Sequence, residues 1–358
     1  MINIEFENYF NTLNFSSRKR REFSKFFSSL KSEATTGLTK CVICGRECSS
    51  FCKSHSIPAF VLRQIASNGK IMVGSDNVLP FDDKHGVSNT LTFSCICSQC
   101  DNEYFQEYEN PDILSSDKVN DVCINEIAVK CYLRHYYKRL KEQKIFEYLL
   151  TNAQDSYSMQ RFSNKLLTTQ LDITDVERRI NKILKKKDEH NFYLIDEINL
   201  DYKVELAYQG AIALSQGFDG QVNELNNYNP KYKIEQLYLC VFPLKNKSKI
   251  LVFCEEGSKR MKRFYKGYRK LSLDEKLYAL NYIILLYEEE WCTSADFDRK
   301  KLNVDTLKII NQMTDIAIQT NNANEYNIAG KQMINNLSTS VFEIKTSGNI
   351  YNFLEKHQ

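Results

Sequence analysis

The stretch from Cys41 to Asn110 decides the fold prediction. It opens with CVICGRECSSFCKSHSIPAF at residues 41–60 and closes with FSCICSQCDNEYFQEYEN at residues 93–110. Each end carries a Cys-x2-Cys pair: Cys41 with Cys44, and Cys97 with Cys100. Thiolates at this spacing on a tight turn can bind one tetrahedral ion, and a second pair completes its four ligands. Because four thiolates leave no open position for water or substrate, the sequence predicts a structural Zn²⁺ ion.

The distribution of the cysteines supports a metal site over disulfides. The chain has 12 cysteines, and seven of them lie between residues 41 and 100. We interpret Cys48, Cys52 and Cys95 as buried thiols; the alternatives are further ligands, or a second ion shared with His85. The other cysteines lie in apolar patterns and are predicted to belong to the core: Cys123, Cys131, Cys240, Cys254 and Cys292.

Between the two cysteine pairs lies Lys53-Ser-His-Ser-Ile-Pro58. With this segment, the stretch resembles the HNH, or ββα-metal, nucleases. Members of that family often carry a zinc ion held by two Cys-x2-Cys turns. Their catalytic histidine follows the first pair in a short His-x-x-Pro segment, and a helix follows the second pair. The resemblance covers about seventy of the 358 residues.

The resemblance implies roles for four residues of this chain. His55 falls on the general-base position, and Asp101 falls where the family has the Asn that orients this histidine. Asn110 falls near the third position, where an Asn or His binds the catalytic metal. Hydrolysis of a phosphodiester needs a base for water and a divalent ion to neutralise the phosphate. We therefore expect His55 as base, Asp101 as its orienter or a metal ligand, and Glu109 or Asn110 as a ligand of Mg²⁺ or Mn²⁺.

Two positions depart from the family pattern. Ser54 stands where many members carry an acidic metal ligand, and Asp101 replaces the middle Asn. A site without catalytic activity therefore stays open. Asp101 also suits the start of a helix, because its side chain can accept hydrogen bonds from free amides. That helix is predicted to end before Pro111, with Glu109 or Asn110 at its end.

Composition and charge limit the classes of function that this chain can have. The apolar fraction is 42%, with 21 Tyr and 21 Phe, which is ample for a sizeable core. No apolar run is long enough for a membrane span, and the N-terminus lacks the features of a signal peptide. We therefore expect a soluble cytoplasmic protein without a membrane partner. The net charge of +3 is too small by itself to indicate a nucleic-acid binder.

Two basic stretches suggest local contacts to phosphates. The first is a predicted helix near residues 17–27, and the second covers residues 259–270, where cations alternate with Phe264, Tyr265 and Tyr268. Such cations can bind a phosphate backbone while the rings stack on bases. For both stretches the alternative is a solvated basic helix face. The nucleic-acid-binding candidates are Arg18, Lys19, Arg20, Arg21, Lys262 and Arg263.

The rest of the chain alternates between helical and strand periodicity. Helices are predicted over residues 60–65, 117–150, 173–187, 272–290 and 304–320. The helix at 272 opens with the capping box Ser272-Leu-Asp-Glu275. Asn68-Gly69 predicts a turn into a strand at 70–73. Residues 191–197, 202–209, 234–242 and 249–254 predict an antiparallel sheet, with a short helix at 211–215.

These patterns predict an α+β protein with three parts. Residues 1–40 form a basic helical segment, residues 41–115 a zinc-bound HNH-like nuclease module, and residues 116–358 a mainly helical α+β domain of unassigned role. The predicted function is metal-dependent hydrolysis of phosphodiester bonds, with DNA favoured over RNA. The resemblance further implies bacterial phage defence. Two alternatives are an inactive zinc-stapled nucleic-acid-binding protein, and a scaffold or sensor in a defence complex whose C-terminal domain binds a partner protein or another copy.

Overall fold

The computed structural model describes most of the chain. The described residues are 37–74, 84–153, 155–218, 220–224, 229, 231–287, 290–303 and 351–357, with Glu22, Lys25, Phe26 and Ser29 of the N-terminal segment. The predicted helix at 304–320 and the basic residues Arg18 to Arg21 lie outside these residues. Within them, no helix combines the length and apolar character needed to cross a membrane.

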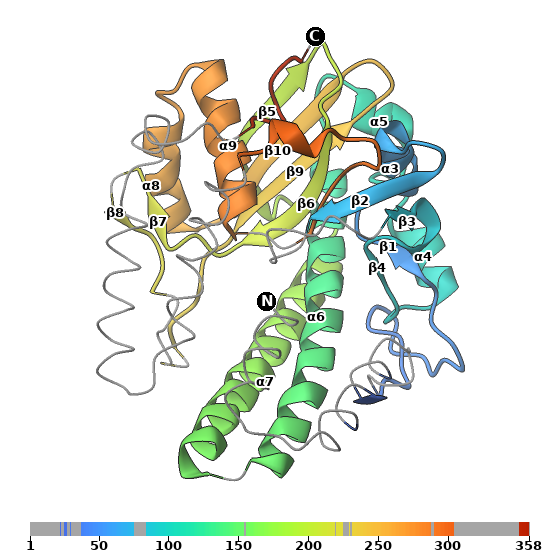
Figure 1. Cartoon of the computed structure of the whole chain (residues 1–358), viewed down its shortest axis with the longest axis vertical. Helices are drawn as coiled ribbons and strands as arrows, with labels where there is room; N and C mark the ends of the chain where they lie inside the picture. Colours follow the sequence, from blue (N-terminus) through green and yellow to red (C-terminus); the bar gives the residue numbers. More distant parts are fainter. Residues whose placement is uncertain are drawn as a thin grey trace.

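A seven-stranded antiparallel sheet forms the centre of the molecule (Figure 1). In spatial order its strands are β3 (Lys84–Gly86), β2 (Lys70–Gly74), β11 (Trp291–Ser294), β6 (Leu206–Ile212), β9 (Leu237–Pro243), β10 (Ser248–Glu255) and β5 (Phe192–Leu200). The predicted antiparallel sheet is confirmed. Strands β2 and β3 precede residue 115, and β2 pairs with β11, so hydrogen bonds of one sheet cross the boundary predicted between residues 115 and 116.

Strand β9, an inner strand of the sheet, is buried on both faces, which explains its uninterrupted apolar sequence. Successive side chains of a strand point to opposite faces of the sheet. Tyr238, Cys240 and Phe242 accordingly belong to one hydrophobic cluster, whereas Leu237 and Leu239 belong to another. The sheet therefore separates two cores, and each core is closed by a different set of helices.

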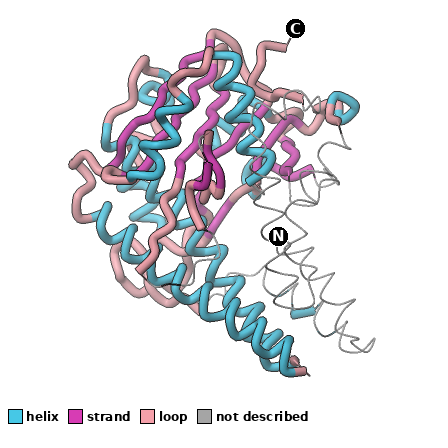
Figure 2. The backbone as a smooth tube through the Cα atoms, turned by 90° about the vertical axis from the view of Figure 1, so that its left-hand side faces the viewer, coloured by secondary structure: helices cyan, strands magenta, loops and turns pink. Residues whose placement is uncertain are grey.

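The first core lies beneath α3 (Ala59–Ile65), α6 (Asp121–Asn152) and α7 (Ser156–Leu184). The second lies beneath α8 (Lys259–Tyr268), α9 (Leu273–Tyr287) and the C-terminal residues 351–354. Helices α6 and α7 form an antiparallel hairpin that extends beyond the sheet in Figure 1 and again in the rotated view of Figure 2. The cysteine-rich segment shares the first core with α6.

Local sequence signals determine where three of the helices begin. The side chain of Asn120 accepts a hydrogen bond from Cys123 N at 2.8 Å and begins α6. Asp155 does the same for Ser158 N at 2.7 Å and begins α7. The predicted capping box is confirmed: Ser272 N donates to Glu275 Oε2 at 2.9 Å, and Glu275 N donates to Ser272 Oγ at 3.4 Å.

Several predicted bounds need correction. Residues 211–215 are not a helix, because Ala211 and Ile212 continue β6 and pair with Tyr238 and Leu237 of β9. Burial in the sheet outweighs their local helical preference here. Helix α7 begins at Ser156 rather than near residue 173. Residues 68–69 form the predicted turn, with φ of 50° and 72°.

Candidate metal centre and adjoining polar cluster

The four cysteines of the two Cys-x2-Cys pairs converge on one point. The sulfur atoms of Cys41, Cys44, Cys97 and Cys100 all lie within 4.8 Å of one another, and the sulfurs of Cys44 and Cys97 are 3.9 Å apart. Zinc–sulfur bonds of about 2.3 Å in a tetrahedron separate sulfur atoms by about 3.8 Å. The predicted ligand set is therefore brought together, and its size fits a structural Zn²⁺ ion.

Backbone geometry holds each pair in place. Gly45 adopts a φ of 68° and donates its N–H to Cys41 O at 2.8 Å, which closes the first turn. Cys97 is the residue directly before α4 (Ser98–Tyr104), and its N–H donates to the sulfur of Cys41 at 3.3 Å. The first turn of a helix thus carries the second pair towards the first.

The electrostatics of the cluster favour thiolates on its exposed side. Arg46 Nε donates to the sulfur of Cys44 at 3.2 Å, and this hydrogen bond lowers the pKa of the Cys44 thiol to about 6. Burial raises the pKa of the Cys41 and Cys100 thiols, so a bound cation is needed to keep all four ligands deprotonated near neutral pH. The guanidinium also offsets part of the negative charge of a four-thiolate site.

A small two-stranded antiparallel sheet and a helix are formed by residues next to the two cysteine pairs in the chain. Strand β1 (Ser54–His55) pairs with β4 (Thr92–Phe93), with His55 opposite Thr92, and α4 follows after Cys97. The ring nitrogen Nε2 of His55 lies 3.0 Å from the carbonyl oxygen of Val87. Because a carbonyl only accepts, Nε2 carries the hydrogen and Nδ1 keeps its lone pair in the neutral ring. His55 is partly exposed.

A residue that the sequence reasoning missed supports this arrangement. Asn89 belongs to the short 3₁₀ turn Val87–Asn89 whose carbonyl contacts His55, and its Oδ1 accepts a hydrogen bond from Lys53 Nζ at 2.6 Å. This bond ties the turn to the residue just before β1. Asn89 could be found only from the pairing register of β1 with β4, because no motif marks it.

Asp101 and Glu109 meet at a lysine instead of at His55. Lys130, in the middle of α6, places its ammonium 2.8 Å from Asp101 Oδ1, 2.9 Å from Glu109 Oε1 and 2.7 Å from Ser54 Oγ. The Ser54 hydroxyl donates to Asp101 Oδ1 at 2.7 Å. We call Ser54, Asp101, Glu109 and Lys130 the Lys130 cluster. Adjacent strand residues point to opposite faces, so Ser54 faces this cluster while His55 faces Val87.

The helix predicted from Asp101 to Asn110 is wrong in two respects. Helix α4 begins at Ser98, so Asp101 lies within its first turn and does not cap it. The helix ends at Tyr104, and a separate helix α5 (Pro111–Ser115) begins after Asn110, whose Oδ1 accepts from Asp112 N at 2.9 Å. Proline is well suited to the first position of a helix, because its missing N–H would have no partner there. The described contact of Asn110 is thus a helix cap.

A catalytic divalent ion does not fit the Lys130 cluster as it stands. Mg²⁺ binds oxygen ligands at about 2.0–2.1 Å. The two carboxylates that would supply such ligands already hold the ammonium of Lys130 between them, at 2.8 and 2.9 Å. The predicted roles of His55, Asp101, Glu109 and Asn110 in catalysis stay predictions.

The second basic stretch forms α8. Phe264 and Tyr268 face the second core and are only 2% and 0% exposed. Nucleic-acid bases cannot reach these two rings, so the predicted stacking by them is wrong. Lys262 forms an ion pair with Glu256 at 2.9 Å, and Arg263 is exposed. The ammonium of Lys262 also lies 5.2 Å from the ring of Tyr193.

The structure also places the other cysteines and His85. Cys95 is buried, as predicted, but Cys48 and Cys52 are partly exposed, so the prediction of buried thiols is wrong for these two. His85 lies on β3 opposite Ile71 instead of in a loop. The five scattered cysteines are all buried, as predicted: Cys123, Cys131, Cys240, Cys254 and Cys292.

No known protein family, curated protein or solved structure matches this chain.

Proposed function

We propose that this chain is an HNH-type endonuclease that hydrolyses phosphodiester bonds, with DNA as the favoured substrate and His55 as general base. The observation that carries the proposal is the position of His55 on β1, which pairs with β4 ahead of α4 and lies in the chain between the two converging cysteine pairs, with Nε2 held by Val87 O. A pair of short strands with a helix after the second strand agrees with the resemblance to the ββα-metal nucleases, and in this chain α3, β2 and β3 are inserted between the two strands.

The chemistry assigned to His55 follows from its hydrogen bond. A ring whose Nε2–H is held by a carbonyl has a fixed orientation and presents the lone pair of Nδ1 on its other side. That nitrogen can accept the proton of a water molecule as the water attacks phosphorus. A zinc ion would join the segment before β1 to the start of α4. It would take no part in the reaction because its four ligands would be thiolates.

Cleavage assays with matched histidine variants test this proposal. Zinc-loaded wild type, His55→Ala and His85→Ala would be incubated with supercoiled plasmid, single-stranded DNA and RNA, each with EDTA, Mg²⁺ or Mn²⁺. Loss of the general base is expected to lower the cleavage rate about 10²- to 10⁴-fold in His55→Ala. His85 is an exposed histidine on β3, so His85→Ala should cleave like the wild type. Equal rates for wild type and His55→Ala, with equal zinc content, would reject His55 as the base.

The Lys130 cluster favours a second candidate, a zinc-stapled module that binds a nucleic acid or a partner protein without hydrolysis. Its two carboxylates are already paired with an internal cation, which leaves them poorly suited to a catalytic metal. In this case the wild type would cleave no substrate under any of the conditions above, and binding of nucleic acid would be measured by fluorescence anisotropy. In the defence context implied by the resemblance, such a chain would serve as a scaffold or sensor.

A further inference from the structure

We propose that the ammonium of Lys130 permanently takes the place of a divalent ion between Asp101 and Glu109, and so closes this acidic pair to Mg²⁺ and Mn²⁺. The inference goes beyond the proposed function, and its readout is the binding of an ion and not cleavage. A divalent ion that takes part in cleavage would then have to bind at residues other than this pair.

The contacts of Lys130 saturate its ammonium group. An ammonium has three hydrogens to donate, and three oxygens surround Nζ: Ser54 Oγ at 2.7 Å, Asp101 Oδ1 at 2.8 Å and Glu109 Oε1 at 2.9 Å. The ring of Phe105 lies with its centroid 4.0 Å from Nζ, within the range of a cation–π contact. The cation is thus enclosed by the partners that a small metal ion would need.

The charges of the cluster suit occupation of the acidic pair by a single lysine. Asp101 and Glu109 bring two negative charges, Lys130 brings one positive charge, and Ser54 is neutral. The Ser54 hydroxyl bridges the two charged groups, since it accepts from Lys130 Nζ and donates to Asp101 Oδ1. A third carboxylate at position 54 would leave two negative charges unbalanced around one ammonium. A serine at this position therefore suits a site that is occupied by lysine.

Burial makes the lysine a permanent occupant. The side chain of Lys130 has 0% of its surface exposed, while those of Asp101 and Glu109 are 21% and 40% exposed. A buried ammonium without its carboxylates would be strongly destabilising, so the group cannot easily leave this position. The carboxylates, in contrast, border solvent on one side, and an ion with its water could reach them if the lysine were absent.

Replacing Lys130 with methionine tests the proposal. Methionine is unbranched, flexible and uncharged, so it can fill the apolar path of the lysine and leave the two carboxylates unpaired. The binding of Mn²⁺ to zinc-loaded full-length chain would be followed by electron paramagnetic resonance of the free ion. Lys130→Met is expected to bind Mn²⁺ at least about tenfold more tightly than wild type, because ligand charge sets the affinity of such sites. The double variant Lys130→Met/Asp101→Asn should lose this gain.

Two results would overturn the proposal. One is wild type binding Mn²⁺ as tightly as Lys130→Met, with the binding lost in Asp101→Asn. The other is a folded, zinc-loaded Lys130→Met that binds no more Mn²⁺ than wild type.

A measurement on wild type alone keeps the test independent of whether the variant folds. Mn²⁺ broadens the NMR signals of nuclei close to it. The backbone amide signals of Ser54, Asp101 and Glu109 in wild type should stay sharp at Mn²⁺ concentrations that broaden exposed acidic positions elsewhere. Selective broadening of these three signals would show that the ion displaces Lys130 and would overturn the proposal.

Discussion

The Lys130 ammonium lies 2.8 Å from the Asp101 carboxylate, and this ion pair joins the helix that carries Cys100 to the long helix α6. Asp101 directly follows a predicted zinc ligand, whereas Lys130 belongs to the helix that packs on the sheet. The cysteine-rich segment is therefore joined to the rest of the α+β fold by buried charge as well as by apolar contacts. Buried charges are costly unless they are paired and hydrogen-bonded, which makes the stability of this junction sensitive to single substitutions.

Asp101→Asn is expected to destabilise the chain. The substitution removes one of the two carboxylates that compensate the fully buried ammonium of Lys130, while the other, Glu109, remains. Removing one partner of a buried ion pair costs about 3–5 kcal/mol, and we expect the lower end of this range. Urea unfolding of the zinc-loaded chain measures the change. Asp117→Asn, at an exposed position, serves as the control and should leave the midpoint unchanged.

Cys97→Ser should abolish stoichiometric zinc binding. Its sulfur is one of the four that lie within 4.8 Å of one another, and a closed zinc site depends on all of them. Cys48→Ser is the matched control, because Cys48 lies in the same segment and directs its thiol to the carbonyl oxygen of Arg46 at 3.4 Å. Zinc per chain after gel filtration is the measurement. Equal zinc content in both variants would contradict the assignment of the ligands.

Tyr108→Phe tests a second junction between the cysteine-rich segment and the sheet. The buried Tyr108 hydroxyl lies 2.7 Å from Ser56 O and 2.5 Å from Gln209 Oε1, so it connects the residue after β1 with β6. Losing the hydroxyl leaves buried acceptors unsatisfied, at a cost of about 1–3 kcal/mol. Thermal unfolding should show a lower midpoint in Tyr108→Phe. Tyr157→Phe, at an exposed position on α7, should unfold like the wild type.

Much of the fold was predictable because its signals are local. The spacing of the cysteines identified the four-sulfur cluster, Ser272 and Glu275 marked the start of α9, and the Asn68-Gly69 turn preceded β2 as expected. Each cysteine pair, the capping box and the turn depend on residues that are near one another in the sequence, because ligand reach, capping and positive φ act over a few residues. The convergence of the two pairs, which places Cys44 and Cys97 together across 53 positions, was predicted from the four ligands that a zinc ion requires.

The composition of the polar site was not predictable, because it depends on pairing between distant segments. Lys130 follows Asp101 by 29 residues, and a lysine within a helical pattern is normally expected to face solvent. Its burial follows from the packing of α6 against the segment that contains Phe93 and Phe105. The contact of His55 with Val87 likewise depends on the register of β1 with β4, which no sequence motif specifies.

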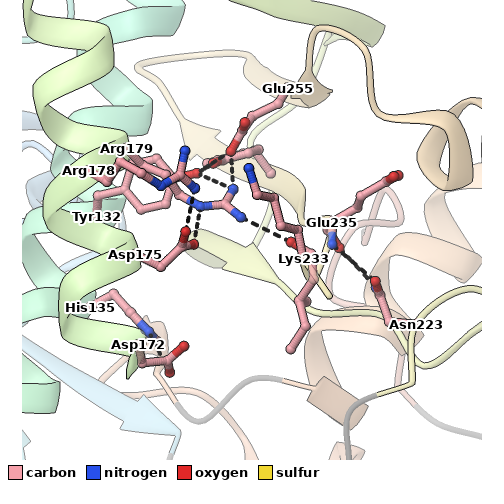
Figure 3. A network of polar contacts seen from close by, with 12 residues as sticks. Tyr132, His135, Asp172, Asp175, Arg178, Arg179, Asn223, Lys233, Glu235 and Glu255 are labelled. Carbon is pink, nitrogen blue, oxygen red and sulfur yellow. Dashed lines mark hydrogen bonds and ion pairs between the residues drawn. The ribbon is translucent and has the colours of Figure 1, made fainter. Parts of the chain in front are cut away.

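The acid stability of the chain should depend on Asp175 of α7. This residue lies in the network of Figure 3, where its carboxylate accepts from Arg178 and, at 2.5 Å, from Arg179 Nε. Arg179 also pairs with Glu255 of β10, so the network connects α7 to the sheet. Burial alone would raise the pKa of Asp175, but the two guanidinium groups outweigh it and hold the pKa below its ordinary value of 3.8.

A carboxylate whose pKa is lowered on folding stabilises the folded state above its unfolded pKa, and this stabilisation is lost as the pH falls through the folded pKa. Asp175→Asn should therefore lower the free energy of unfolding by about 1 kcal/mol at pH 7, since the carboxylate is partly exposed. The difference from wild type should shrink below about pH 4, where Asp175 of the wild type also becomes neutral. Asp201→Asn, at an exposed turn, is the control and should match wild type throughout. Urea unfolding between pH 3 and pH 7 makes the comparison, and a difference that stays constant down to pH 3 would show that Asp175 acts through packing rather than through its charge.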